Sequence, residues 1–161
     1  MRNDNAECRN KYRNNCLVCD RIALICKNAN PWFVKELETG YIVIGDHQHF
    51  WGYTLFLCKE HQPELHMLTP AFRLKFLEEM SLVAEAVYKA FRPDKLNYEL
   101  LGMGDAHMHW HIFPRRAGDT PKLGPVWWLP IEEWQCDAAK PSEAELNEMI
   151  ALLKCELEML L

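Results

Sequence analysis

The chain's 161 residues suffice for one domain with a buried core, and its 49% hydrophobic and 25% charged residues are the usual balance of a globular protein. A formal net charge of -5 argues against a broad nucleic-acid-binding surface, because such surfaces are basic. No apolar run approaches the roughly 20 residues of a membrane span, and the polar N-terminus lacks a secretion signal, so we expect a cytoplasmic protein that binds neither nucleic acid nor membrane.

The first half of the chain predicts a flexible start, a short helix, three strands and one long helix. Residues 1–15 are polar and expected to be flexible. The sequence then predicts a helix over 19–28 and strands over 32–39, 41–46 and 53–58, the first two joined by a turn at Thr39 and Gly40. A long helix over 69–91 follows, with Thr69 as N-cap, Pro70 at the first helical position and an apolar stripe of Phe72, Phe76, Met80, Val83, Val87 and Phe91.

The second half predicts two further strands and a C-terminal helix. The strands cover 97–102 and 108–113, and the short segment 103–106 joins them. A segment rich in Pro, Gly and Trp follows over 118–134, in which we expect Trp127 and Trp128 to pack the C-terminal part onto the domain rather than stack on a base or cover a partner's site. The last helix begins at Ser142, with Glu145 completing a capping box.

Together these elements predict an α+β fold: a mostly antiparallel sheet carrying one long helix, plus a C-terminal helix. We expect a single domain over 16–161, with a C-terminal extension from about residue 117.

Three alternating histidines are the most informative feature of the sequence. His107, His109 and His111 lie in "AHMHWHIFPRR", and on a strand alternate side chains share one face. They could simply be the polar face of a strand. However, the glycines ahead of them would let backbone amides approach a ligand, and Arg115 and Arg116 behind them can meet phosphate. Neutral imidazole is also a good nucleophile towards phosphorus.

This strand resembles the His-x-His-x-His motif of the histidine triad superfamily of nucleotide hydrolases and transferases. The similarity extends over roughly residues 16–116 and includes "YIVIGDHQHFWGYTLFLCKEH", the long helix after it, and "NYELLGMGDAHMHWHIFPR". Family members often carry Asn where Met103 stands and Gly-Gln-Ser or Gly-Gln-Thr where Gly104, Asp105 and Ala106 stand, so the chain departs from the pattern there.

The resemblance implies roles for individual residues. His109 would be the nucleophile that attacks the α-phosphorus, and His111 would donate a hydrogen bond to a phosphate oxygen. Asp46 would contact the ribose. The backbone amides of Gly104, Asp105 and Ala106 would hold the phosphate, and Arg115 also belongs to this predicted nucleotide site.

The pair Cys16 and Cys19 has the spacing of metal ligands, although a redox pair or two buried thiols would have the same spacing. One branch of the family binds a structural zinc, and the resemblance implies His61 and His107 as the other two ligands here. No catalytic metal is implied.

We therefore predict a homodimeric nucleotide hydrolase or nucleotidyl transferase. It would act on dinucleoside polyphosphates, as in diadenosine polyphosphate hydrolases, or on nucleoside phosphoramidates, through a nucleotidyl-histidine intermediate. The alternative is a nucleotide-binding or zinc-stabilised scaffold protein with little catalytic activity, which the residues at Met103 and Asp105 favour.

Overall fold

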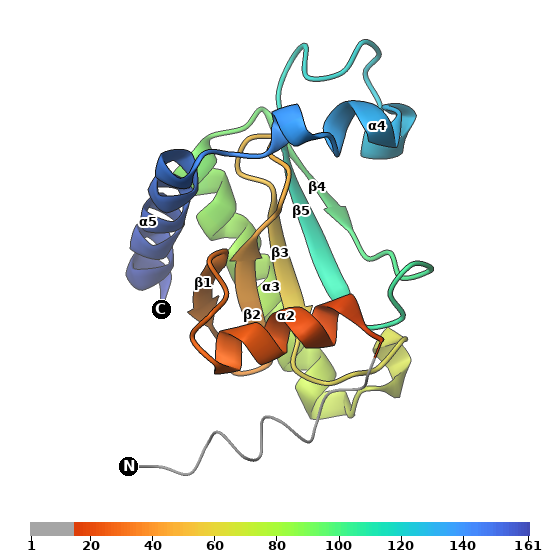
Figure 1. The fold of residues 1–161 in the computed structure, drawn as a ribbon. Coiled ribbons are helices and arrows are strands. Elements are labelled where there is room, and N and C mark those ends of the chain that lie inside the picture. The colour runs from red at the N-terminus through yellow and green to blue at the C-terminus, as the bar shows by residue number, and fades with distance from the viewer. Residues whose placement is uncertain (1–14) are drawn as a thin grey trace.

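A five-stranded antiparallel sheet forms the centre of the protein (Figure 1). The computed structural model describes residues 15–161, so the flexible segment predicted for residues 1–15 lies outside them except for its last residue. The strands are β1 (Phe33–Glu36), β2 (Gly40–Ile44), β3 (Thr54–Cys58), β4 (Lys95–Glu99) and β5 (His109–Arg115), and their order across the sheet is β1-β2-β3-β5-β4. The strand β4 is therefore one edge of the sheet and lies beside β5.

Helices cover both faces of this sheet. On one face α3 (Pro70–Phe91) and α5 (Glu143–Leu160) lie side by side, whereas α2 (Leu17–Cys26) crosses the other face near one end of the strands (Figure 1). A short helix, α4 (Ile131–Trp134), and the 3₁₀ turns η1 (Leu65–Met67), η2 (Val126–Trp128) and η3 (Asp137–Ala139) complete the described elements. None of the helices in residues 15–161 is long and apolar enough to cross a membrane.

Alternation along the strands divides the core into two clusters. Ile42, Ile44 and Phe56 face α3 and α5, while Val43, Leu55 and Leu57 face α2. Because β2 and β3 are buried on both sides, their sequences are almost entirely apolar rather than alternating, and Thr54 is their one polar residue. The predicted α+β architecture with an antiparallel sheet, a long helix and a C-terminal helix is confirmed.

Both predicted helix starts are confirmed in position, but only one of them is capped by a side chain. Ser142 and Glu145 form the predicted capping box at the start of α5. Thr69 is the N-cap residue of α3 and Pro70 its first helical residue, as predicted, but the Thr69 side chain makes no capping hydrogen bond. A carboxylate from within α3 has an additional role: Glu79 is buried and accepts hydrogen bonds from the backbone N–H groups of Glu38 and Thr39, so it fixes the turn between β1 and β2.

The segment after β5 runs back over the sheet and differs from its prediction. Trp127 and Trp128 are 62% and 52% exposed, so the expectation that they pack this segment onto the domain is wrong. Trp134 does so instead, because it is buried against Phe50, Tyr53 and Phe113.

Candidate metal centre and active site

The four predicted zinc ligands come together at one end of the sheet. Cys16 and Cys19 lie at the start of α2, His61 lies in the loop after β3, and His107 lies two residues before β5. Their ligand atoms all lie within 4.8 Å of one another. The Cys19 Sγ is 3.2 Å from His61 Nδ1 and 3.4 Å from His107 Nδ1, and the Cys16 Sγ is 3.6 Å from His107 Nδ1.

These separations fit a tetrahedral zinc ion. With Zn–S of about 2.3 Å and Zn–N of about 2.0 Å, tetrahedral geometry places sulfur and nitrogen ligands about 3.5 Å apart. The Nε2 of His107 lies 2.8 Å from the Cys58 carbonyl oxygen and donates to it, which leaves Nδ1 for a metal, as an oriented ligand histidine requires. Burial also lowers the pKa of His107 to about 4, so the ring is neutral and able to bind metal. Two thiols and two imidazoles form a structural zinc site.

His109 is oriented through one of its two ring nitrogens. Its Nδ1 lies 2.6 Å from the His107 carbonyl oxygen, and a carbonyl can only accept, so Nδ1 carries the proton. The lone pair is therefore on Nε2, the nitrogen that would act as the nucleophile. The histidine is 8% exposed and begins β5, one position later than the strand predicted from the sequence.

His111 lies beside His109 on the same face of β5. Their ring centroids are 4.6 Å apart, so the two side chains can contact one bound group together. Burial, followed by the proximity of His109, lowers the pKa of His111 to about 3, which keeps its ring neutral. The Tyr53 hydroxyl lies 2.6 Å from its Nδ1.

The loop between β4 and β5 is exposed, and its acidic side chain is directed to α2. Asp105 accepts a hydrogen bond from the Leu17 backbone N–H at the first residue of α2, where the helix dipole favours a negative charge. Gly104 and Ala106 are exposed. Gly104 is not among the residues with a positive φ, and a side chain at this position would meet nothing within 4 Å among the described residues. Met103 is fully exposed.

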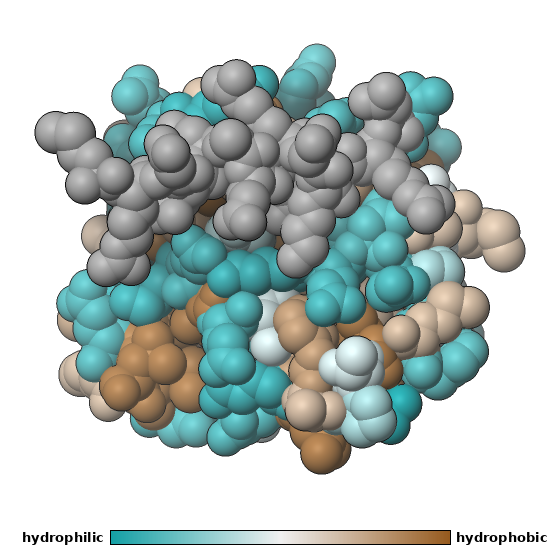
Figure 2. Space-filling model, turned by 90° about the horizontal axis from the view of Figure 1, so that it is seen from below, coloured by the Kyte–Doolittle hydropathy of each residue, from teal (hydrophilic) through white to brown (hydrophobic). Residues whose placement is uncertain are grey.

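Asp46 lies at the end of β2 beside a hollow of about 730 Å³. Its carboxylate forms a two-point ion pair with Arg21 of α2, with Oδ1 2.9 Å from one guanidinium nitrogen. This hydrogen-bonded pairing raises the pKa of Arg21. The hollow is lined by Leu17, Leu24, Trp32 and His47 and, from the C-terminal extension, by Gln135, Asp137 and Lys140 among others. Seen from below, the described surface of the molecule mixes hydrophilic and hydrophobic residues (Figure 2).

The structure does not bring Arg115 to this site as a free cation. Its guanidinium is buried and donates to both carboxylate oxygens of Asp119, to the Gly124 carbonyl and to the Thr120 hydroxyl. Arg116 likewise donates to the carbonyl oxygens of Trp51 and Phe91. The two arginines expected to meet phosphate instead hold the C-terminal segment and the loop ahead of β3.

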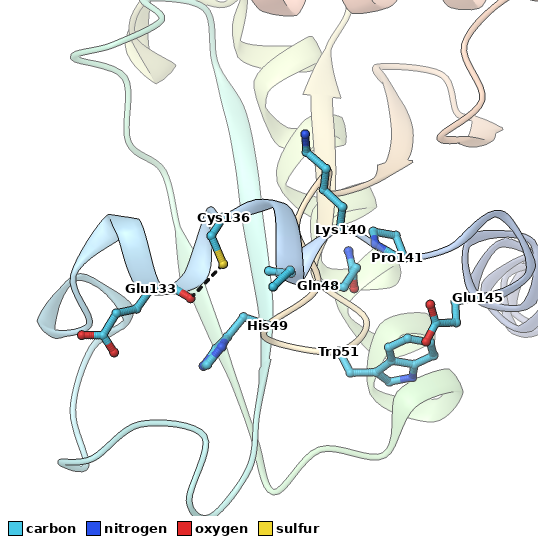
Figure 3. A pocket seen from close by; sticks show the side chains of 10 residues that line it. Gln48, His49, Trp51, Glu133, Cys136, Lys140, Pro141 and Glu145 are labelled. Atoms are coloured by element: carbon cyan, nitrogen blue, oxygen red, sulfur yellow. Dashed lines mark hydrogen bonds between the residues drawn. The ribbon is translucent and has the colours of Figure 1, made fainter.

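The loop between β2 and β3, residues 45–53, lies between the sheet and the C-terminal extension (Figure 3). The Gln48 backbone N–H donates to the Ala139 carbonyl oxygen at 2.6 Å. Its side-chain amide donates to the carbonyl oxygens of Gly45 and Tyr53 and accepts from Gly52 N–H, so one buried glutamine closes the whole loop. The sequence gives no signal for Gln48, Arg21 or Tyr53, because the contacts of each are with residues that are distant in sequence or lie in an irregular loop.

The comparisons with known proteins agree with this geometry. The family model of the HIT domain matches residues 34–118. No curated protein matches the chain. Solved structures that are similar include a histidine triad protein from Bradyrhizobium japonicum, with 21% identity and a TM-score of 0.68, covering 78% of this chain and 89% of that one.

Two further structures extend the similarity. A histidine triad protein from Marinobacter aquaeolei VT8 has 22% identity and a TM-score of 0.68, covering 80% of this chain and 90% of its own. A zinc-bound histidine triad family protein from Mycobacterium smegmatis has 22% identity and a TM-score of 0.60, covering 91% and 95%. Because the matched family model spans more than half of the chain, the protein belongs to the HIT domain family of histidine triad proteins.

Proposed function

We propose that the protein is a nucleotide hydrolase or nucleotidyl transferase that forms a covalent intermediate on His109. The observation that carries this proposal is the hydrogen bond from His109 Nδ1–H to the His107 carbonyl, which puts the lone pair on Nε2. A neutral imidazole fixed in this tautomer is prepared for attack on an electrophilic phosphorus.

The reaction would proceed in two displacements. The Nε2 lone pair attacks the α-phosphorus, an N–P bond forms, and the bond from phosphorus to the leaving group breaks with its electron pair. The leaving group, a nucleotide, polyphosphate or amine, takes a proton from solvent. Water then attacks the same phosphorus and gives a proton to solvent, the N–P bond breaks with its electron pair returning to Nε2, and a nucleoside monophosphate departs. His111 would donate a hydrogen bond to a phosphate oxygen, where charge develops in the transition state.

The nucleoside would lie in the hollow beside Asp46. Aromatic and aliphatic walls from Trp32, Leu17 and Leu24 suit a base, and the Asp46 carboxylate suits ribose hydroxyls. The Arg21 ion pair would have to rearrange or share that carboxylate with the sugar. The backbone amides of Gly104, Asp105 and Ala106 remain the proposed phosphate contacts. The guanidinium of Arg115 donates to both carboxylate oxygens of Asp119, so this structure does not support a contact between Arg115 and phosphate.

Zinc would cross-link the structure around the triad. The zinc-bound relative from Mycobacterium smegmatis and the cluster of two cysteines and two histidines both support this role. When bound, zinc would tie the start of α2 to His107 and so fix the carbonyl that orients His109.

Trapping the intermediate tests the proposal. The protein is mixed with adenosine phosphoramidates or diadenosine polyphosphates, quenched in base, and the modified residue located by mass spectrometry. We expect one adenylyl group on His109 and none in His109→Asn, which should still bind nucleotide. The exposed histidine of η1 gives the matched control, His66→Asn, which should form the adduct normally.

Two outcomes contradict the proposal. An adduct on another residue would refute the assignment of His109. Nucleotide binding without any adduct or turnover on the whole substrate panel would instead favour the scaffold alternative, in which the loop with Met103 and Asp105 no longer supports chemistry.

A further inference from the structure

Tyr53 lies next to the triad histidines, and packing and hydrogen bonds fix its ring and backbone. It precedes β3 and is 6% exposed, and its ring stacks on Phe113 with centroids 4.2 Å apart and planes 2° from parallel. The position of Gly45 leaves space for this ring, since a side chain there would approach it to 2.2 Å. The Tyr53 carbonyl accepts hydrogen bonds from Gly45 N–H and from the Gln48 amide, so both the backbone and the ring are fixed.

Among residues 15–161, the hydroxyl of Tyr53 makes one polar contact, with His111 Nδ1 at 2.6 Å. A tyrosine hydroxyl can donate or accept, so this contact alone allows two arrangements. If it accepted from Nδ1–H, its own proton would be buried with no acceptor among residues 15–161, at the cost of an unmade hydrogen bond. The arrangement in which Tyr53 donates and Nδ1 accepts therefore leaves no buried donor unsatisfied.

We propose that Tyr53 is a positioning residue that holds His111 in the tautomer with its proton on Nε2. The consequence is a division of roles between neighbouring rings. The His107 carbonyl leaves His109 with a lone pair on Nε2, and the Tyr53 hydroxyl leaves His111 with a proton on Nε2. One ring can then attack phosphorus while the other donates to a phosphate oxygen; this use of the tautomer rests on the proposed function.

Burial keeps both members of this pair in the required protonation state. It raises the pKa of Tyr53, so the hydroxyl retains its proton, and the pKa of His111 is lowered to about 3, so its Nδ1 remains an acceptor. His111 is then a neutral donor rather than a cation, and its contribution is directional.

The tautomer itself can be measured without any substrate. In protein labelled with ¹⁵N histidine, long-range ¹H–¹⁵N spectra distinguish a protonated ring nitrogen from a bare one, and His111→Asn identifies the signals of His111. We expect Nε2 protonated and Nδ1 bare in the unsubstituted zinc-loaded protein. A protonated Nδ1 at neutral pH would overturn the proposal, whatever the activity of the protein.

Tyr53→Phe removes only the hydroxyl oxygen and keeps the stacked ring. We expect its spectrum to show the Nδ1-protonated tautomer appearing at His111. For an active protein, kcat should fall by about three- to tenfold, as expected for one lost hydrogen bond, while KM changes by less than about twofold, because the donated bond strengthens as charge develops. Tyr88→Phe removes an exposed hydroxyl on α3 and should change neither readout.

The two proposals fail separately. If no substrate turns over but the spectra behave as expected, the proposed function is wrong and the tautomer assignment stands. An unchanged His111 spectrum and unchanged kcat in a folded Tyr53→Phe protein would show that Tyr53 has no positioning role. Should Tyr53→Phe not fold, the spectrum of the unsubstituted protein still decides.

Discussion

Removing zinc from this protein should loosen a large part of the fold rather than one surface site. The four ligands come from three separate segments: the start of α2, the loop after β3 and the segment just before β5. Three of them are buried, and α2 also contributes Val18, Ile22 and Ile25 to the core cluster beneath it. A chelator would therefore release the cross-link that holds this cluster against the sheet.

The size of the effect follows from linkage. A ligand present at about a thousand times its dissociation constant stabilises the folded state by about 4 kcal/mol. For a domain of this length each kcal/mol shifts the Tm by about 2–4 °C, so chelation should lower the Tm by about 8–16 °C. The same loss is expected in Cys19→Ser, because that thiol contacts both ligand histidines.

The assay combines metal analysis with thermal unfolding. Dialysed protein should retain about one zinc ion per chain, and adding zinc after chelation should restore the Tm. Cys155→Ser changes an exposed cysteine on α5 and should retain both the metal and the Tm. If dialysed protein holds no zinc, and neither chelator nor Cys19→Ser moves the Tm, the assignment of the metal site is wrong.

Three further predictions concern stability and assembly. Asp119→Asn breaks a buried ion pair with Arg115 and should cost about 3 kcal/mol, or a Tm lower by about 6–12 °C, in thermal unfolding; an unchanged Tm would contradict the role given to this pair. Burial raises the pKa of Glu99, only partly offset by Arg115, so the folded state holds the proton more tightly and loses stability as pH rises above the ordinary carboxyl pKa. Glu99→Gln should therefore raise the Tm at about pH 8 and lose this advantage near pH 4; a gain that is independent of pH would refute the reasoning. Light scattering should give a homodimer, since the edge strand β4 and the outer face of α3 expose Tyr98 and Leu74, and a monomer at micromolar concentration would rule this out.

The fold was predictable because its signals are local. Apolar runs at 41–46 and 53–58 mark strands buried on both faces, and Ser142 with Glu145 marks a helix start through hydrogen bonds between residues three apart. The prediction of which tryptophans are buried was wrong, because tertiary contacts rather than local sequence decide it. Trp127 and Trp128 are as apolar as Trp134, yet only Trp134 faces the core, and nothing in the composition of 118–134 distinguishes them.

The candidate site was predictable only in part for the same reason. The zinc ligands were found because Cys16 and Cys19 have a characteristic spacing and the family resemblance supplied the histidines. Arg115 was expected to meet phosphate because it follows the triad, but the sequence does not reveal that Asp119 turns back to pair with it. Tyr53 gives no sequence signal either, since its role depends on one hydroxyl meeting a ring 58 positions away.

The three triad histidines have the same side chain, and their roles differ because each has a different hydrogen-bond partner. His107 donates from Nε2 to the Cys58 carbonyl, which leaves Nδ1 for metal. His109 donates from Nδ1 to the His107 carbonyl, which leaves a nucleophilic Nε2. His111 meets the Tyr53 hydroxyl at Nδ1, which would leave Nε2–H as a donor. Because each partner is fixed by a different element, the same side chain at alternate positions can serve as ligand, nucleophile and donor within one strand's length.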